Sequence, residues 1–279
     1  MAVNFPVDFT KMSGTGNDFI VIDHRQPFLS KAEMPAFAKA VCRRKFSAGA
    51  DGLILIENCD DADFRWQFLN GDGSFAEMCG NGARCAARFA HAKGIAQAKM
   101  RFATMAGIIE AEVIGASVRL KMTEPNGLAL DNVLGVDEQD VVVHSLNTGV
   151  PHAVIFMDDI AAAPVFEWGR LVRFHDHFQP AGTNVNFVQV LADGSVVCRT
   201  YERGVEEETM ACGTGAVAAA IIAGLKGYVQ APVAVTTSGG DRLTIHFKIA
   251  AGRPMDVYLE GPANFIYDGR LHEEAVRSK

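Results

Sequence analysis

Two stretches of the chain carry the same pattern of cysteine, glycine and alanine. The first, "CGNGARCAARFAHAKG", runs from Cys79 to Gly94, and the second, "CGTGAVAAAIIAGLKG", runs from Cys212 to Gly227. Nine of the sixteen aligned positions are identical, including the cysteine, the Gly-x-Gly that follows it and the final Lys-Gly pair. Each stretch predicts a helix that opens at the Gly-x-Gly and stops at a glycine in the left-handed conformation.

The similarity continues beyond the helix. Cys212 lies 133 positions after Cys79, and the same spacing pairs Thr104 with Thr237. In both halves a run of alternating apolar and polar residues follows and ends near a proline, which is typical of a β-hairpin. A repeat of this length indicates a duplicated domain rather than a solenoid of short repeats.

The expected fold is therefore α+β, with two similar domains that each wrap a mostly antiparallel sheet around the central alanine-rich helix. Small side chains on several faces of that helix allow strands to approach it closely. We expect one domain to comprise residues 1–123 and 262–279 and the other residues 124–261, with the active site in the cleft between them.

Local patterns predict further elements. Short β-branched or aromatic runs bounded by Gly, Asn or Asp predict strands, and apolar periodicity predicts helices. The expected strands are 18–24, 52–58, 63–73, 153–157, 186–191 and 196–204, and the expected helices are 31–44, 82–94, 164–175 and 215–227. At the first helix, Ser30 and Glu33 have the spacing of an N-terminal capping box.

Composition excludes several classes of protein. The 279 residues carry a net charge of -7 and no basic stretch, which argues against nucleic-acid binding. The N-terminal sequence does not resemble a signal peptide, and no apolar run is long enough to span a bilayer, so we expect a cytoplasmic protein without a membrane anchor. The six cysteines form no C-x-x-C pair and no usual zinc spacing, which predicts reduced thiols and no metal site.

The position of the repeated cysteine suggests its chemistry. A helix N-terminus presents free N–H groups and a partial positive charge, which favour a thiolate and bind a carboxylate. If the two halves face each other, one cysteine stands on each side of the carbon next to that carboxylate. One thiolate then removes the α-proton and the opposite thiol delivers another, which inverts the carbon without pyridoxal phosphate or a metal.

Across essentially its whole length the sequence resembles the diaminopimelate epimerase family, whose members use two cysteines and no pyridoxal phosphate. The matching stretches are "KMSGTGNDF", "GADGLI", "FLNGDGS", "MCGNGARC", "NTGVPH", "TNVNFVQV" and "YERGVEEETMACGTGA". The resemblance implies epimerisation of LL-2,6-diaminopimelate to the meso form, a small diamino-diacid substrate of lysine and peptidoglycan synthesis, with no cofactor.

The resemblance also implies roles for single residues. Cys79 and Cys212 are the expected acid–base pair, and His152 is expected beside the reacting centre. The backbone N–H groups of Gly80, Asn81, Gly213 and Thr214 are expected to hold the reacting carboxylate. The substrate's amino and carboxylate groups are assigned to Asn17, Asn70 and Asn184 and to the charged pair Glu202 and Arg203.

Each of these residues also has a plainer interpretation. The asparagines suit turns, His152 suits a surface loop, and Glu202 with Arg203 suits a solvated strand pair. Two positions depart from the family, because Val150 and Gly52 stand where some members carry Asn and Gln. Both changes affect substrate recognition rather than the two-base chemistry.

Three rival functions are compatible with parts of the pattern: a racemase of proline, hydroxyproline or histidine, a binding protein on the same scaffold, and a thiol–disulfide redox protein. The presence of both cysteines argues against simple binding. The oligomeric state, a homodimer among the options, is left open by the sequence.

Overall fold

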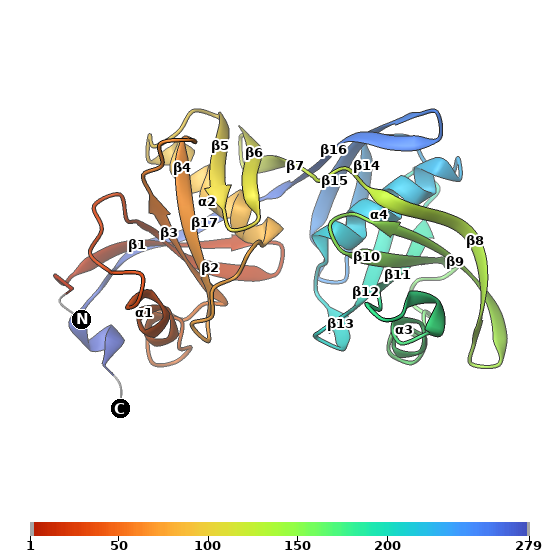
Figure 1. Cartoon of the computed structure of the whole chain (residues 1–279), viewed down its shortest axis with the longest axis horizontal. Coiled ribbons are helices and arrows are strands. Elements are labelled where there is room, and N and C mark those ends of the chain that lie inside the picture. Colours follow the sequence, from red (N-terminus) through yellow and green to blue (C-terminus); the bar gives the residue numbers. More distant parts are fainter. Residues whose placement is uncertain (1–2, 278–279) are drawn as a thin grey trace. The chain divides into compact units, whose positions relative to one another are not determined.

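The computed structural model describes residues 3–277, which divide into two compact units (Figure 1). The first unit extends to Leu120 and resumes at Gly261, and the second is Lys121–Glu260. The boundaries at 123/124 and 261/262 expected from the sequence lie within three residues of these.

The first unit is built on a sheet with strand order β17-β1-β2-β3-β4-β5-β6-β7. Only the β2/β3 and β4/β5 pairs of this series are parallel. Its strands are β1 (Val7–Gly14), β2 (Asn17–Asp23), β3 (Gly52–Glu57), β4 (Phe64–Asn70), β5 (Lys99–Thr104), β6 (Gly107–Ile114), β7 (Ser117–Lys121) and β17 (Asn264–Leu271). Its helices are α1 (Met34–Val41), α2 (Gly80–Ala92) and the 3-10 helix η2 (Glu273–Val276).

The second unit repeats this topology with the order β8-β9-β10-β11-β12-β14-β15-β16. The parallel pairs are again the third and the fifth of the series, β10/β11 and β12/β14. Its strands are β8 (Asn126–Val136), β9 (Gln139–Asn147), β10 (Pro151–Phe156), β11 (Asn184–Val190), β12 (Val196–Glu202), β13 (Glu207–Thr209), β14 (Val233–Thr237), β15 (Arg242–Ala250) and β16 (Arg253–Pro262). Its helices are α3 (Val165–Arg173), α4 (Gly213–Leu225) and the 3-10 helix η1 (Asp176–Phe178).

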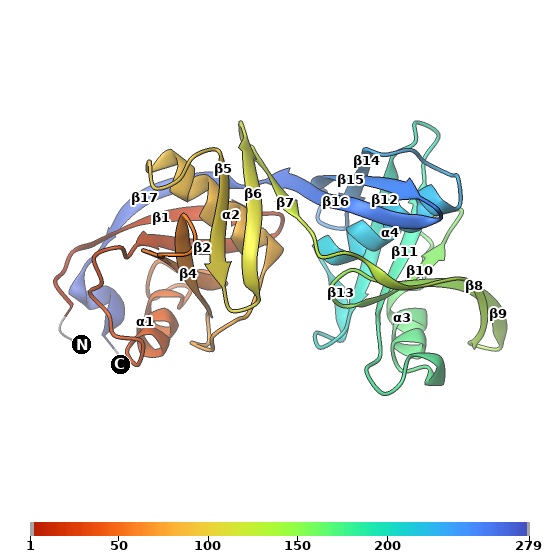
Figure 2. The same cartoon turned by 45° about the horizontal axis from the view of Figure 1, so that its top comes forward.

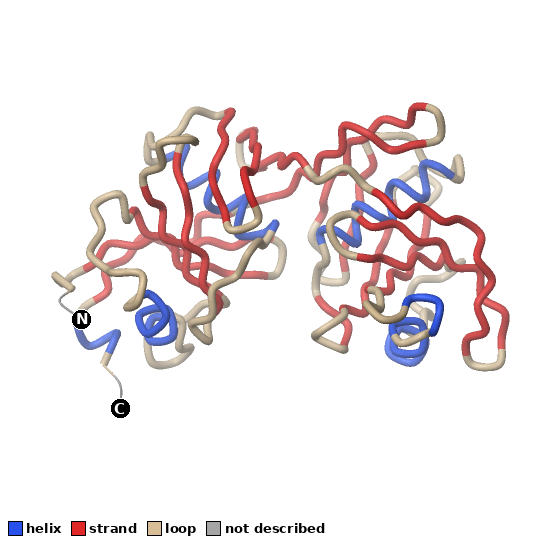
Figure 3. The backbone as a smooth tube through the Cα atoms, viewed as in Figure 1, coloured by secondary structure: helices blue, strands red, loops and turns tan. Residues whose placement is uncertain are grey.

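The duplication therefore covers every main strand, not only the helix and hairpin visible in the sequence. Helices α1 and α3 connect equivalent parallel strands, as do α2 and α4 (Figure 3). The C-terminal strand β17 takes, beside β1, the place that β8 takes beside β9. The first unit is thus completed by the end of the chain.

Each sheet is covered by helices on both faces (Figure 2). In the first unit α2 packs on β1, β2, β3 and β6, and α1 packs on β3 and β4. The strand β2 shows the reason in its sequence, because Phe19 and Val21 enter the core under α2 while Ile20 and Ile22 enter the core under α1. Continuous apolar strands of this kind are typical of sheets buried on both faces.

The second unit has the same layers. Helix α4, apolar all round, packs on β9, β10, β11, β12, β14 and β15, and α3 packs on β8, β11, β12 and β13. The run from Ala216 to Ala223 is fully buried, which requires the small side chains that the sequence supplies.

Helix ends agree with the sequence in one respect and differ in another. Gly94 and Gly227 follow their helices with φ of 68° and 76°, as predicted. Helix α1, by contrast, begins at Met34, three residues later than expected, with Glu33 rather than Ser30 as its N-cap. The predicted contact exists, since the Ser30 hydroxyl donates to Glu33 at 2.8 Å, but it stabilises a turn that precedes the helix.

Among the described residues no helix is long and apolar enough to cross a membrane.

Candidate functional site

Cys212 is the N-cap of α4. Its extended backbone (φ -120°, ψ 105°) turns the chain into the helix, and its carbonyl accepts the Ala216 N–H at 2.9 Å. Its thiol is partly buried, unbridged, and 3.6 Å from the Thr214 hydroxyl. The N–H groups of the first helical turn lie beside the sulfur, where an anion is favoured.

Cys79 occupies the same position at α2. Its backbone is also extended (φ -148°, ψ 116°), its carbonyl accepts the Ala83 N–H at 2.8 Å, and its Sγ accepts the Gly82 N–H at 3.5 Å. This thiol too is partly buried and unbridged. The sequence repeat therefore builds two equivalent cysteine-capped helix N-termini, one on each unit.

The prediction of a favoured thiolate is wrong for Cys212 in this structure. Burial raises the pKa of the Cys212 thiol to about 11, and the nearby Glu202 carboxylate adds to the increase. Hydrogen bonds from the Thr214 hydroxyl and from the backbone N–H groups of Gly215 and Thr214 oppose the shift without cancelling it. At neutral pH this cysteine is consequently a thiol, able to give a proton.

His152 lies in β10 and is buried, with 1% of its surface exposed. Its Nδ1 is 3.1 Å from the Asn186 side-chain nitrogen. No described residue hydrogen-bonds to its Nε2. Burial, helped by the charge of Arg203, lowers the pKa of His152 to about 3, so the ring is neutral. A surface-loop histidine is therefore excluded.

Asn184 pairs with His152 across the parallel strands β10 and β11. Its side chain bridges two segments, donating to the Pro151 carbonyl at 3.2 Å and accepting the Arg203 N–H at 2.8 Å. The Arg203 guanidinium donates to the Ala181 carbonyl at 2.9 Å. Glu202, the last residue of β12, lies close enough to Cys212 to raise the pKa of its thiol.

The predicted residues of the first unit lie at the equivalent strand ends. Asn17 begins β2 and Asn70 ends β4, where it pairs with Gly52 of β3. Asn81, in the first turn of α2, donates from its side chain to Asn17 Oδ1 at 2.8 Å. The Asn70 side chain instead donates to the Ser74 hydroxyl at 3.0 Å across the tight turn that follows β4.

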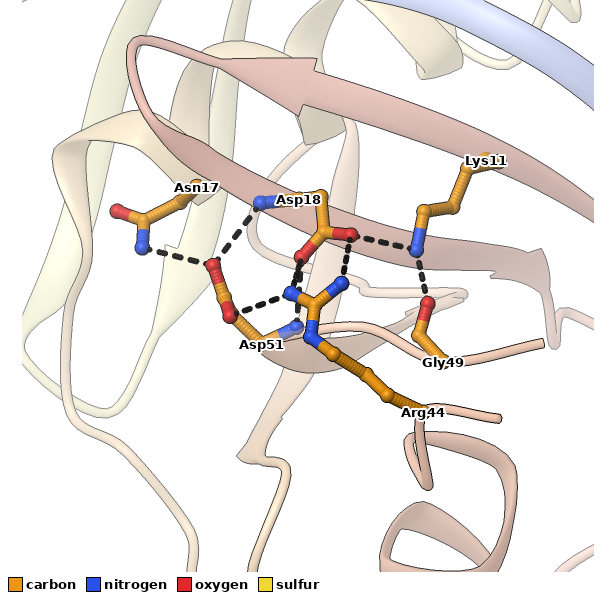
Figure 4. A network of polar contacts seen from close by, with 6 residues as sticks. All are labelled: Lys11, Asn17, Asp18, Arg44, Gly49 and Asp51. Carbon is orange, nitrogen blue, oxygen red and sulfur yellow. Dashed lines mark hydrogen bonds and ion pairs between the residues drawn. The ribbon is translucent and has the colours of Figure 1, made fainter. Parts of the chain in front are cut away.

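A charged network that the sequence did not reveal holds Asn17 from its other side (Figure 4). The Asn17 side chain donates to Asp51 at 3.1 Å, and Arg44 donates to both Asp51 and Asp18. Lys11 pairs with Asp18 at 2.8 Å. Although burial acts to raise it, the hydrogen bonds from Arg44 and Lys11 hold the pKa of Asp18 at about 2.

The predicted residues thus form one set on each unit. Both sets lie at a cysteine-capped helix and at strand ends, those of β2 and β4 in one unit and those of β10, β11 and β12 in the other. A separate hollow of about 460 Å³ in the first unit contains none of them; it is lined by residues such as Asp8, Asp23, Lys93, Asp268 and Arg270. Within residues 3–277 no cluster of His, Cys, Asp and Glu side chains could hold a metal ion.

Sequence reasoning missed Asp18, Arg44 and Asp51, and also Asn186 beside His152. The available signal was polar residues inside otherwise apolar strands. Asn184 and Asn186 alternate in "NVNFVQV", so both point to the same face of β11. Arg44 carried no signal, because it comes from a loop that only the fold brings to β2.

Comparison with known proteins points to one family. The family model described as diaminopimelate epimerase matches residues 9–128 and 144–266. A protein named diaminopimelate epimerase from Aquifex aeolicus is 47% identical over 97% of this chain and 99% of its own length. Another of that name from a Hydrogenobaculum species is 42% identical over 95% of this chain and 98% of its own length.

Solved structures with low sequence identity share the fold. A PhzF-family phenazine biosynthesis protein from Bacillus anthracis matches with a TM-score of 0.67 and 12% identity, covering 96% of this chain and 99% of that one. A hydroxyproline epimerase from Agrobacterium vitis matches with a TM-score of 0.66 and 15% identity, covering 98% and 94%.

Proposed function

Because this chain belongs to the diaminopimelate epimerase family, we propose that it interconverts LL-2,6-diaminopimelate and meso-2,6-diaminopimelate. The enzyme is an isomerase of the lysine-biosynthesis type. The observation that carries the proposal is the pair of cysteine-capped helices at equivalent positions of a duplicated fold. A binding protein needs neither thiol, and a single-base enzyme needs only one.

In the proposed reaction the two units enclose the substrate, with Cys79 and Cys212 on opposite faces of its α-carbon. The thiolate of one cysteine takes the α-proton, and the thiol of the other gives its proton to the opposite face. The thiol and the thiolate exchange places in each turnover, so no external acid or base is consumed. N–H groups of Gly80, Asn81, Gly213 and Thr214 stabilise the charge that builds on the carboxylate.

The protonation state of Cys212 supports its role as the proton donor. With a pKa of about 11 this cysteine carries a proton at neutral pH, as the donor for one direction of the reaction requires. In the reverse direction it must act as a base. The backbone N–H groups of Thr214 and Gly215, which act to lower its pKa, support that second role.

The remaining residues suit a substrate that is charged at both ends. Arg203 offers a planar fork for a carboxylate, Glu202 can accept from an ammonium group, and Asn17, Asn70 and Asn184 supply amide donors and acceptors. No observation favours proline, hydroxyproline or histidine as the substrate, because the likeness to a hydroxyproline epimerase is at 15% identity and shows the fold alone. A cytoplasmic location and independence of nucleic acid stay predictions, and the oligomeric state, with a homodimer as one option, stays open.

The test is α-proton exchange in deuterated water, without added cofactor, starting separately from LL- and meso-diaminopimelate. Cys79→Ser should slow proton removal from one isomer far more than from the other, and Cys212→Ser should do the reverse. Cys59→Ser is the matched control, because Cys59 is a partly exposed free thiol that follows β3 at the end opposite Gly52, and it should leave both rates unchanged. Unaltered exchange in both site variants would refute the two-base scheme.

A further inference from the structure

The second glycine of each Cys-Gly-x-Gly lies against side chains of the parallel strands beneath it. In the first unit these are Phe19 and Ile54, both within 3.5 Å of a Cβ added at Gly82. Phe19 pairs with Gly52, and two residues on, Val21 pairs with Ile54. This layer is apolar.

The equivalent layer of the second unit is polar. His152 pairs with Asn184, and two residues on, Val154 pairs with Asn186, so His152 and Asn186 hold the places of Phe19 and Ile54. A Cβ added at Gly215 would lie 2.2 Å from Asn186 Oδ1 and 3.3 Å from Cys212 Sγ. The fold accepts an apolar pair at this place, which means that the buried polar pair is not needed to form the fold.

The contacts of Asn186 fix which end of its amide faces His152. The Ala153 carbonyl can only accept, and it lies 2.8 Å from the Asn186 side-chain nitrogen. The Thr200 hydroxyl donates to Asn186 Oδ1 at 2.9 Å. The NH₂ group therefore points toward Ala153 and toward His152 Nδ1, 3.1 Å away, and the amide is held from three sides with none of its surface exposed.

This arrangement determines the tautomer of the histidine. Because the Asn186 NH₂ donates, His152 Nδ1 must accept, and the ring proton lies on Nε2. That Nε2–H group is buried and has no partner among the described residues. A buried donor without a partner is costly, which favours an acceptor that arrives with the ligand.

We propose that Asn186, anchored by Thr200, is a positioning residue that holds His152 as an Nε2–H donor for an anionic acceptor of the reacting complex on the Cys212 side. The identity of the ligand rests on the proposed function, whereas the geometry of Asn186 and His152 does not depend on it. His152 in this state stabilises negative charge on a carboxylate oxygen or on a thiolate sulfur. It does not act as the base, since its only free lone pair faces Asn186.

The tautomer can be read directly in the unliganded full-length protein by ¹⁵N NMR with labelled histidine. His152 should show a protonated Nε2 and an unprotonated Nδ1. Asn186→Asp reverses the donor at 186, because a carboxylate accepts, and should move the proton signal onto Nδ1. Asn132→Asp is the matched control, since the Asn132 side chain also donates to a strand carbonyl, that of Val143 at 3.3 Å, and it should leave the His152 signals unchanged.

Kinetics provide the second readout. In Asn186→Asp we expect kcat to fall about tenfold or more, equivalent to the loss of one transition-state hydrogen bond, with a much smaller change in KM. A protonated Nδ1 in the wild-type protein, or an unchanged kcat in Asn186→Asp, overturns the proposal even if the wild type epimerises diaminopimelate. Failure of the proposed function itself would appear instead as a wild type that exchanges no α-protons.

A double variant covers the case in which Asn186→Asp fails to fold. His152→Phe with Asn186→Ile gives the second unit the layer that the first unit already has. It should fold with a thermal midpoint near that of the wild type, lack the assigned histidine signals and lose most of its kcat. Loss of folding, or retention of full activity, would contradict the argument that the polar pair serves the reaction and not the fold.

Discussion

The two copies of Cys-Gly-x-Gly predict opposite outcomes for the same substitution. In Gly82→Ala the added Cβ meets Ile54 Cδ1 at 3.4 Å, an ordinary contact. Gly82 also lacks a positive φ, so alanine gains helix propensity, and the free energy of unfolding should rise by up to about 1 kcal/mol. In Gly215→Ala the added Cβ would lie 2.2 Å from Asn186 Oδ1.

That overlap cannot be relieved cheaply, because Asn186 is buried and hydrogen-bonded to His152, Ala153 and Thr200. Overpacking in a core typically costs about 1–3 kcal/mol, which exceeds the gain of about 1 kcal/mol in helix propensity. We expect Gly215→Ala to be less stable than the wild type by up to about 2 kcal/mol, and to be about 1–3 kcal/mol less stable than Gly82→Ala, which has the same gain without the overlap.

The chain offers a separate reporter for each unit, since Trp66 lies in the first and Trp168 in the second. Urea unfolding followed by tryptophan fluorescence, in Trp168→Phe and Trp66→Phe backgrounds, measures the two units individually. Gly215→Ala should lower the midpoint reported by Trp168 and displace Asn186, with a loss of kcat. Equal stability of the two alanine variants in their own units would refute the packing argument.

Two further predictions concern the charged groups of the site. Glu202→Gln should lower the pKa of Cys212, because the carboxylate contributes to its rise to about 11. Alkylation of Cys212 by iodoacetamide, located by mass spectrometry, should then be several-fold faster in this variant at pH 8. In the wild type the alkylation rate should increase about tenfold per pH unit below the pKa. Glu138→Gln, at an exposed position of the turn between β8 and β9, is the control, and an unchanged rate in Glu202→Gln would contradict the assignment. Asp51→Ala removes one of the two side chains that hold the Asn17 amide. We expect KM to rise about fivefold, which corresponds to the loss of one hydrogen bond worth about 1 kcal/mol. The free energy of unfolding should change by less than about 1 kcal/mol, because the ion pair between Asp51 and Arg44 is exposed. Steady-state kinetics and urea unfolding measure both, and an unaltered KM would show that Asp51 does not position Asn17.

The repeated sequence by itself determined the duplication, the two cysteine-capped helices and the glycines that end them. These features depend on local chemistry, because a helix start, an Ala-rich buried face and a left-handed stop are encoded within a few neighbouring residues. The family resemblance added the site residues, and the structure distributes them over two equivalent places. The predicted start of α1 at residue 31 was wrong, since the Ser30–Glu33 pair fits a turn as well as a helix cap.

Tertiary structure alone decided what each group does once it is in place. The pKa of Cys212 depends on burial and on Glu202 at the end of strand β12, which outweigh the effect of the helix N-terminus that sequence reasoning relied on. The strand β17 returns from the far end of the chain to complete the first sheet. The tautomer of His152 depends on Asn186, 34 residues away. Long-range contacts of this kind leave no periodic trace in a sequence, because they are set by which strands pair and in what register, and register is a property of the assembled sheet.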